Sequence, residues 1–153
     1  MSCVSWCNFT GTIPEKLPGS QLSTWDVGLA LLSNYACNEL LKVFREETPT
    51  VPTQFYIAIN STACTRATQG TELVGDNYSR TPVTFERVSD IQVWNPADAT
   101  SAAASAEWPT VASFSLHDAP SGGNYWGYGN LATSISVAAS KAVLWEAERL
   151  TIG

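Results

Sequence analysis

The chain has 153 residues, with 14 acidic and 8 basic side chains, a single His and a formal net charge of −6. This length is that of one domain with a sizeable core, and the acidic balance argues against nucleic acid as a direct partner. Only 14% of the residues are charged and 44% are hydrophobic, which excludes a disordered chain and favours a protein packed against neighbours.

The first 21 residues are predicted to form an extended arm, followed by a single helix-plus-β domain over residues 22–153. The arm has no periodic pattern and contains Gly and Pro, yet it is too apolar for a solvated tail. It either packs across its own domain or reaches a neighbouring subunit, because exposed aromatic side chains usually mark interaction surfaces. The candidate partner-interface residues are Cys3, Trp6, Cys7, Phe9 and Ile13.

Residues 23–46 are predicted to form one amphipathic helix. Ser23 with Asp26 gives a start similar to a capping box, and Thr48 before Pro49 ends the helix. Apolar residues recur at steps of three and four along one stripe, namely Trp25, Leu29, Leu32, Ala36, Leu40, Val43 and Phe44. Leu31 and Tyr35 add a second apolar edge, so we expect burial of more than half of the helix circumference.

Beyond Pro52 the pattern changes to short strands separated by turn residues. Eight or nine strands are predicted, at residues 54–60, 78–87, 91–94, 102–106, 112–116, 125–128, 131–137, 142–145 and 149–152. The strand over 112–116 is expected to have one polar face. The fold class is therefore mainly β, an antiparallel β-sandwich or jelly-roll-like domain with one N-terminal α-helix and an extended N-terminal arm.

His117 is the only imidazole, and with Asp118 it is the one candidate for hydrolytic chemistry. Neighbouring side chains on a strand point to opposite faces, which disfavours the pair as a unit that activates a nucleophile. No Ser lies in the Gly-x-Ser-x-Gly turn that exposes a nucleophile. We expect no enzymatic activity and no catalytic residue, with His117 as a strand-end residue bonded to a turn.

Cofactors and a membrane are not expected as partners. Cys3 and Cys7 are four apart, but no second close pair and no His cluster completes a zinc site. No stretch approaches the 18 to 20 apolar residues of a membrane span, and the N-terminus has no secretory signal pattern. The four cysteines are therefore expected to be reduced in the cytosol, with late disulfides outside the cell as the alternative.

A cluster of aromatic residues is the best candidate for surface binding. Trp108, Tyr125, Trp126 and Tyr128 could stack on sugar rings, as aromatic platforms do in carbohydrate-binding β-sandwiches. The alternative is that Trp126 and Tyr128 alternate because they face the core, and burial is the more common state of such residues.

Several motifs occur in a characteristic order along the chain. They are Asn38-Glu39-Leu40-Leu41-Lys42-Val43-Phe44, Phe55-Tyr56-Ile57-Ala58-Ile59, Gly70-Thr71-Glu72-Leu73 with Tyr78-Ser79-Arg80, Trp108-Pro109-Thr110-Val111, and Gly122-Gly123-Asn124. In this order they resemble a family of small virion proteins of tailed bacteriophages, described as head-decoration, minor tail or tail-fibre-like proteins. The resemblance covers roughly residues 33–152, the extent of one compact domain.

This resemblance implies a β-rich assembly module that binds other virion subunits and has no catalytic residue. With the apolar arm and the few charges, it leads us to expect a capsid decoration (cement) protein of the virion, assembled in the host cytoplasm. Its partners would be the major capsid protein or other virion subunits, and copies of itself in a trimer. The alternatives are a tail fibre, baseplate or minor tail protein that contacts host glycans, a free carbohydrate-binding module, and a small hydrolase.

Overall fold

The structure is a computed structural model that describes residues 23–24 and 31–152. The predicted interface residues of the arm, from Cys3 to Ile13, lie outside this part of the chain. The elements are β1 (Ser23–Thr24), β2 (Leu31–Leu32), α1 (Asn34–Lys42), the 3-10 helix η1 (Val43–Arg45), β3 (Phe55–Asn60), β4 (Thr81–Val83), β5 (Glu86–Ser89), β6 (Gln92–Trp94), β7 (Ala99–Thr100), β8 (Trp108–His117), β9 (Tyr125–Val137), β10 (Val143–Trp145) and β11 (Thr151–Ile152).

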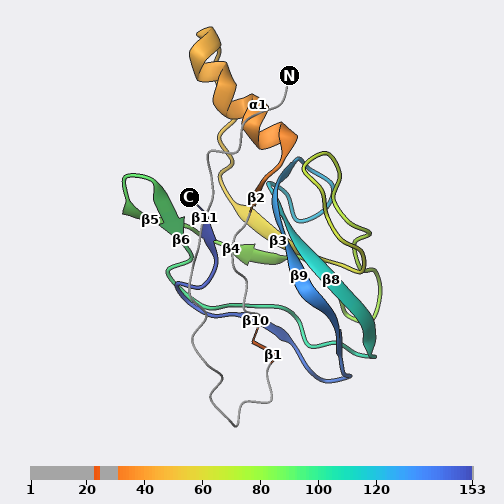
Figure 1. The fold of residues 1–153 in the computed structure, drawn as a ribbon. Helices are drawn as coiled ribbons and strands as arrows, with labels where there is room; N and C mark the ends of the chain where they lie inside the picture. The colour runs from red at the N-terminus through yellow and green to blue at the C-terminus, as the bar shows by residue number, and fades with distance from the viewer. Residues whose placement is uncertain (1–22, 25–30, 153) are drawn as a thin grey trace.

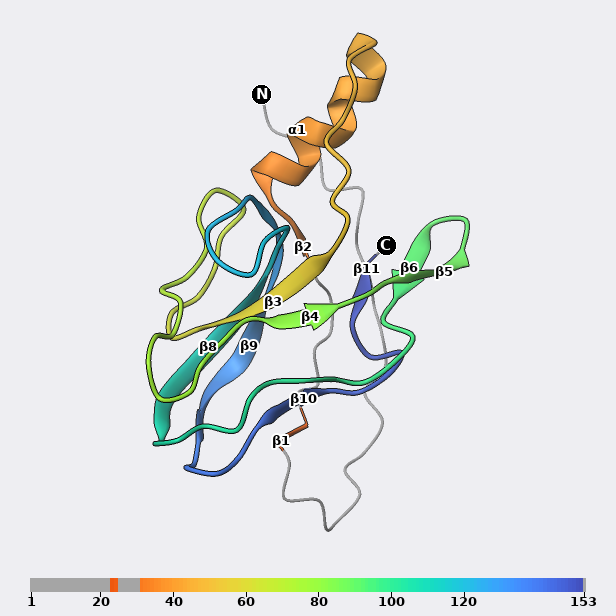
Figure 2. The same cartoon turned by 180° about the vertical axis from the view of Figure 1, so that it is seen from behind.

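The strands form three sheets, and every pairing is antiparallel except that of β1 with β10. The largest sheet has the order β2-β9-β8-β3-β4, and two smaller sheets have the orders β1-β10-β7 and β11-β6-β5. Figures 1 and 2 show β8 and β9 as the long strands of the large sheet, with α1 projecting beyond one end. The predicted mainly β, sandwich-like fold is confirmed.

One face of the large sheet lies in the hydrophobic core. The register pairs Ile57 with Leu116 and Ile59 with Phe114, so these side chains share a face. Gly129 stands opposite Phe114 on β9, and a Cβ at that position would overlap the phenyl ring. Ala99 of β7 and Val143 and Trp145 of β10 complete the core, together with Leu150 just before β11.

The helix is shorter than the sequence pattern predicts. Leu31 and Leu32 pair with β9 as an edge strand, and α1 begins only after Ser33, whose Oγ accepts the N–H of Ala36 at 3.1 Å. The Ser33 hydroxyl also donates to the carbonyl of Tyr125, which ties the helix start to β9. A helical start at Ser23 is wrong, since Ser23–Thr24 pairs with β10. The sheet supplies backbone hydrogen bonds that compete with a longer helix.

The expected burial of this helix is also wrong. Ala36 and Glu39 are its only buried side chains in α1, and η1 has none. Leu40, Val43 and Phe44, which belong to the predicted apolar stripe, are exposed. The stripe has the right spacing, but the projection of α1 beyond the sheet leaves it without a cover among the described residues (Figure 2).

Three strand predictions differ from the structure. Residues 78–87 form two short strands in different sheets, β4 and β5, instead of one strand. Residues 125–128 and 131–137 belong to one continuous strand, β9. Its glycines do not break the strand: Gly129 makes room for the Phe114 ring of β8, and Gly127 lies close to the backbone carbonyl of Leu31 on β2. Residues 102–106 form no strand, and the short strand β7 lies just before them.

Candidate functional site

The second face of the large sheet carries small polar side chains that are as buried as the apolar core. Asn60, Ser113, Ser115 and His117 alternate with the core residues of β3 and β8, and each is at most 1% exposed. We call these four residues the polar layer. The predicted polar face over 112–116 is therefore real, but it does not face solvent.

Within the polar layer, Ser115 is the central residue. Its Oγ lies 3.0 Å from Nε2 of His117 and accepts a hydrogen bond from Nδ2 of Asn60 at 3.1 Å. Nδ1 of His117 and Oδ1 of Asn60 have no hydrogen-bond partner in the described part of the chain. Burial, helped by the nearby Arg80 charge, lowers the pKa of His117 to about 4, so the imidazole is neutral at pH 7.

The loop that follows β3 covers the polar layer. The thiol of Cys64 is buried and accepts the N–H of Gly70, with a sulfur–nitrogen distance of 3.1 Å, and it lies 3.1 Å from Oγ of Ser113. The Asn130 side chain bonds both the N–H and the carbonyl of Cys64, at 2.7 and 3.0 Å. The Ser115–His117 distance suits a nucleophile and its base, but the loop leaves neither side chain accessible to a substrate.

Asp118, the predicted partner of His117, is used elsewhere. Its carboxylate accepts hydrogen bonds from the backbone and side chain of Asn124, both at 2.7 Å, and from Nε1 of Trp126 at 3.0 Å. Burial opposes ionisation, but the bonds from Asn124 and Trp126 outweigh it and lower the pKa of Asp118. The carboxylate therefore holds the turn between β8 and β9 in shape.

An ion pair that the sequence reading missed lies beside the polar layer. Nη2 and Nε of Arg80 donate to the Glu72 carboxylate at 2.7 and 2.8 Å, and Nη1 donates to the carbonyls of Ala119 and Gly122. Tyr78 adds a hydrogen bond to Glu72 at 2.8 Å. Glu72, Tyr78 and Arg80 lie in one of the motifs that carry the family resemblance. They join the β3–β4 connection to the β8–β9 turn, which gives that motif a structural role.

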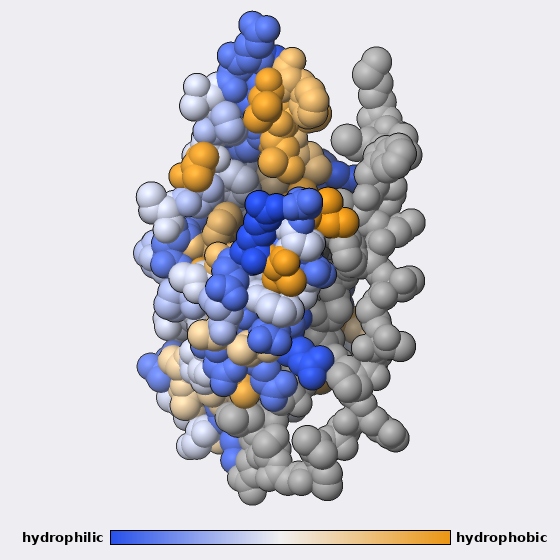
Figure 3. Space-filling model, turned by 90° about the vertical axis from the view of Figure 1, so that its left-hand side faces the viewer, coloured by the Kyte–Doolittle hydropathy of each residue, from blue (hydrophilic) through white to orange (hydrophobic). Residues whose placement is uncertain are grey.

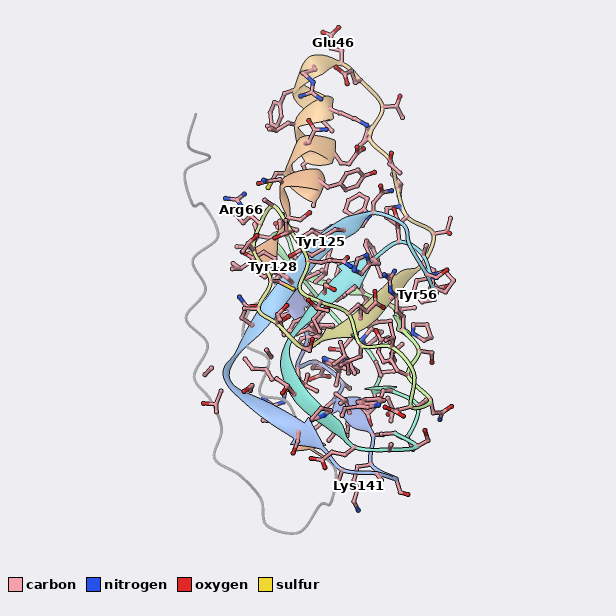
Figure 4. The ribbon with its side chains drawn as sticks, turned by 90° about the vertical axis from the view of Figure 1, so that its right-hand side faces the viewer. Glu46, Tyr56, Arg66, Tyr125, Tyr128 and Lys141 are labelled. Carbon is pink, nitrogen blue, oxygen red and sulfur yellow. The ribbon has the colours of Figure 1, made fainter. Side chains whose placement is uncertain are left out.

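The four aromatic candidates do not form one surface. Trp108, at 2% exposure, lies in the hydrophobic core, whereas Tyr128, at 6% exposure, is buried opposite Ser115 on the face of the polar layer. Tyr125 is half-buried and donates to the carbonyl of Thr65 at 2.7 Å. In Figure 4, Tyr125 and Tyr128 lie near Arg66, where the covering loop crosses β9.

Trp126 is half-buried and stands apart from that group. The rings of Tyr35 and Phe55 meet its indole at interplanar angles of 81° and 90°. It also lines a small apolar pocket where β2, β3, β9 and β11 meet. The lining residues are Leu31, Leu32, Phe55, Leu116, Trp126, Gly127 and Ile152. With no charged or polar side chain in its wall, this pocket suits an apolar group and no sugar.

Among the described residues, four consecutive or near-consecutive apolar side chains are exposed on α1 and η1. Leu40, Leu41, Val43 and Phe44 are 55%, 45%, 61% and 85% exposed, and we call them the helix patch. Figure 3 shows apolar side chains gathered on the end of the molecule that α1 and η1 form. The sequence pattern found this stripe but assigned it to the core, since periodicity says nothing about what covers a face.

Metal ligands and membrane-spanning helices were also sought in residues 23–24 and 31–152. There, no three His, Cys, Asp or Glu side chains lie together as metal ligands. In the same part of the chain, no helix has the length and apolarity required to cross a membrane.

Comparison with protein families identifies the family of this chain. A family model described as Podophage GP4 fiber I protein gp80 matches residues 31–153. No curated protein matches the chain. The matched region begins at β2 and includes α1, the polar layer, the Glu72–Arg80 pair and every strand from β2 to β11.

Proposed function

The chain belongs to the Podophage GP4 fiber I protein gp80 family, a family of phage virion structural proteins, and from this premise we propose that it is a structural subunit of a phage tail fibre. The resemblance to tailed-phage virion proteins is thereby confirmed. Capsid decoration finds no support in the match, which favours the tail-fibre alternative. The observation that carries the proposal is the family match over residues 31–153.

A non-enzymatic role is part of the proposal. It is supported by the burial of Ser115 and His117 beneath the loop that contains Cys64. It is also supported by Asp118, which is engaged in the β8–β9 turn instead of orienting the imidazole. The polar groups of this region hold loops together, which is a task of a scaffold.

The proposed partners are other virion subunits and further copies of the chain, with a trimer as the expected oligomer. Nucleic acid and membrane are not among them, in line with the net charge of −6. Glycan binding is left out of the proposal, because Trp108 and Tyr128 are buried and Trp126 is bounded by Tyr35 and Phe55.

Immunogold electron microscopy of phage particles tests the proposal. Antibodies against the purified chain are expected to label fibres at the tail, and particles from which the gene is deleted should lose those fibres while keeping filled heads. Label over the capsid would support decoration instead and would overturn the tail-fibre assignment. Absence of label from the particle would overturn a virion role.

A further inference from the structure

We propose that the helix patch is the contact by which copies of this chain associate, with the α1 helices of neighbouring copies packed against one another around a shared axis. The inference rests on the proposed function only in assuming that the chain acts as an assembled subunit. It assigns that assembly to four residues, Leu40, Leu41, Val43 and Phe44.

The first argument is the stability of the helix itself. The helical segment from Asn34 to Arg45 buries only Ala36 and Glu39. Isolated helices shorter than about 12 to 15 residues are marginal in water, and most helical stability in proteins comes from packing of an apolar face. That face is present here, with its apolar residues three and four apart, but the described chain does not cover it.

The second argument is that the buried charge of the helix, Glu39, already has its partners within the chain. Glu39 is buried, forms an ion pair with Lys42 at 2.7 Å and accepts the N–H of Thr50 at 2.7 Å. The segment that returns from α1 toward β3 therefore contacts Glu39 and leaves Leu40 and Phe44 exposed. A helix that faced only solvent would have the opposite arrangement.

Charge points to a second copy as the occupant. Lys42 pairs with Glu39, and Arg45 pairs with Glu47 at 3.0 Å, so both cations beside the helix patch are matched within one chain. With three acidic and two basic side chains, residues 34–47 carry a net charge of −1, compared with −6 for the whole chain. A symmetric contact brings identical surfaces together, and it needs such a near-neutral surface because like charges across it repel.

The exposed apolar area of the helix patch and the position of α1 agree with a second copy as the occupant. The helix patch exposes on the order of 500 Å² of apolar surface, which is toward the upper end of patches on monomers. A standard interface buries about 800 Å² per partner, so the flanks of the helix would have to supply the remaining area. Because α1 projects beyond the sheet, helices of several copies can approach without overlap of their sheets (Figures 1 and 2).

The test compares the full chain with Leu40→Gln/Phe44→Gln by sedimentation equilibrium over a wide concentration range. We expect the wild type to be oligomeric and the double variant to dissociate at least 100-fold more readily, because apolar anchors at the centre of an interface dominate its affinity. Val74→Gln/Ile91→Gln is the matched control, since these side chains are 86% and 76% exposed outside α1. The control should associate as the wild type does.

A photocrosslinking variant, Phe44→benzoylphenylalanine, gives a second measurement that does not depend on removing the contact. Crosslinks between α1 peptides of two copies are expected. A monomeric wild type, unchanged association of the double variant, or crosslinks only to residues 1–22 or to a different virion protein would each overturn the inference. The two proposals can fail separately. Capsid labelling would refute the fibre assignment alone. Absence of crosslinks between α1 peptides would refute this inference alone.

Discussion

The two faces of the five-stranded sheet exclude water by different means, although the same strands build both. On one face, Ile57, Ile59, Phe114 and Leu116 fill the space with hydrocarbon. On the other face, the polar layer fills the space with short side chains that bond to one another and to the covering loop. Strand alternation therefore sets which residues share a face, but the elements above each face decide what chemistry is stable there.

Substitutions on the two faces should therefore destabilise the fold for different reasons. The apolar face depends on volume, since its contribution scales with area removed from water. The polar layer depends on complete hydrogen bonding, because a buried group that loses its partner keeps its desolvation cost. Substitutions one residue apart on β8 can separate these two dependences.

The largest effect is expected at Phe114, which is fully buried on the apolar face beside Gly129. Phe114→Ala should lower the free energy of unfolding by about 3–5 kcal/mol through lost burial and the cavity left behind. Urea denaturation measures the change, with Val74→Ala as a control that should stay within about 0.5 kcal/mol. A loss at Phe114 no larger than at Val74 would contradict the assignment of this face to the core.

The next effect is expected at the ion pair beside the polar layer. Arg80→Met should cost about 2–4 kcal/mol, because it leaves the partly buried Glu72 carboxylate without its cation. Glu72→Gln/Arg80→Met should recover part of that loss, since the double variant has no uncompensated charge. The same urea denaturation tests this, with Glu72→Gln as the second single variant. A loss in the double variant equal to the sum of the losses in the two single variants would show that the two side chains act independently.

The polar layer should also make stability depend on pH in a way that the apolar face cannot. The folded pKa of His117 is lowered to about 4, whereas the unfolded value is about 6.5. Only the unfolded state then binds the proton between these values, so stability falls as the pH drops through this window, by up to about 3 kcal/mol. Thermal denaturation at several pH values should show this slope in the wild type.

A matched variant isolates the imidazole from the carboxylates. His117→Gln should be nearly pH-independent between pH 6.5 and 5, where His117 titrates only in the unfolded state. The hydrogen bonds that outweigh burial at Glu72 and Asp118 lower both pKa values below their usual range, so the stability that these carboxylates contribute is lost at lower pH. An equal slope in the variant and the wild type would rule out His117 as the origin.

Sequence reasoning recovered what local periodicity encodes. The alternation over 54–60 predicted β3 and its faces, and the Ser residues of 112–116 predicted a polar face on β8. The burial of that face was not predictable, because its cover comes from contacts such as Cys64 with Ser113 and Asn130, which lie about 50 residues or more along the chain. The prediction that the helix is buried failed for the same reason, because the spacing of Leu40 and Phe44 fits a buried stripe and a partner surface equally well.

The smallest effect is expected one residue after Phe114, and it sharpens the comparison most. Ser115→Ala exchanges a hydroxyl for hydrogen, which on the apolar face would be neutral or favourable. In the polar layer it should cost about 1–2 kcal/mol, because Nδ2 of Asn60 and Nε2 of His117 lose the atom that bonds both. Asn60→Ala/Ser115→Ala should cost less than the sum of the two single variants, since the hydrogen bond between the two side chains can be lost only once. Urea denaturation of the three variants measures the coupling. If Ser115→Ala leaves the free energy of unfolding unchanged, this face requires only a small side chain at that position and no hydrogen bond.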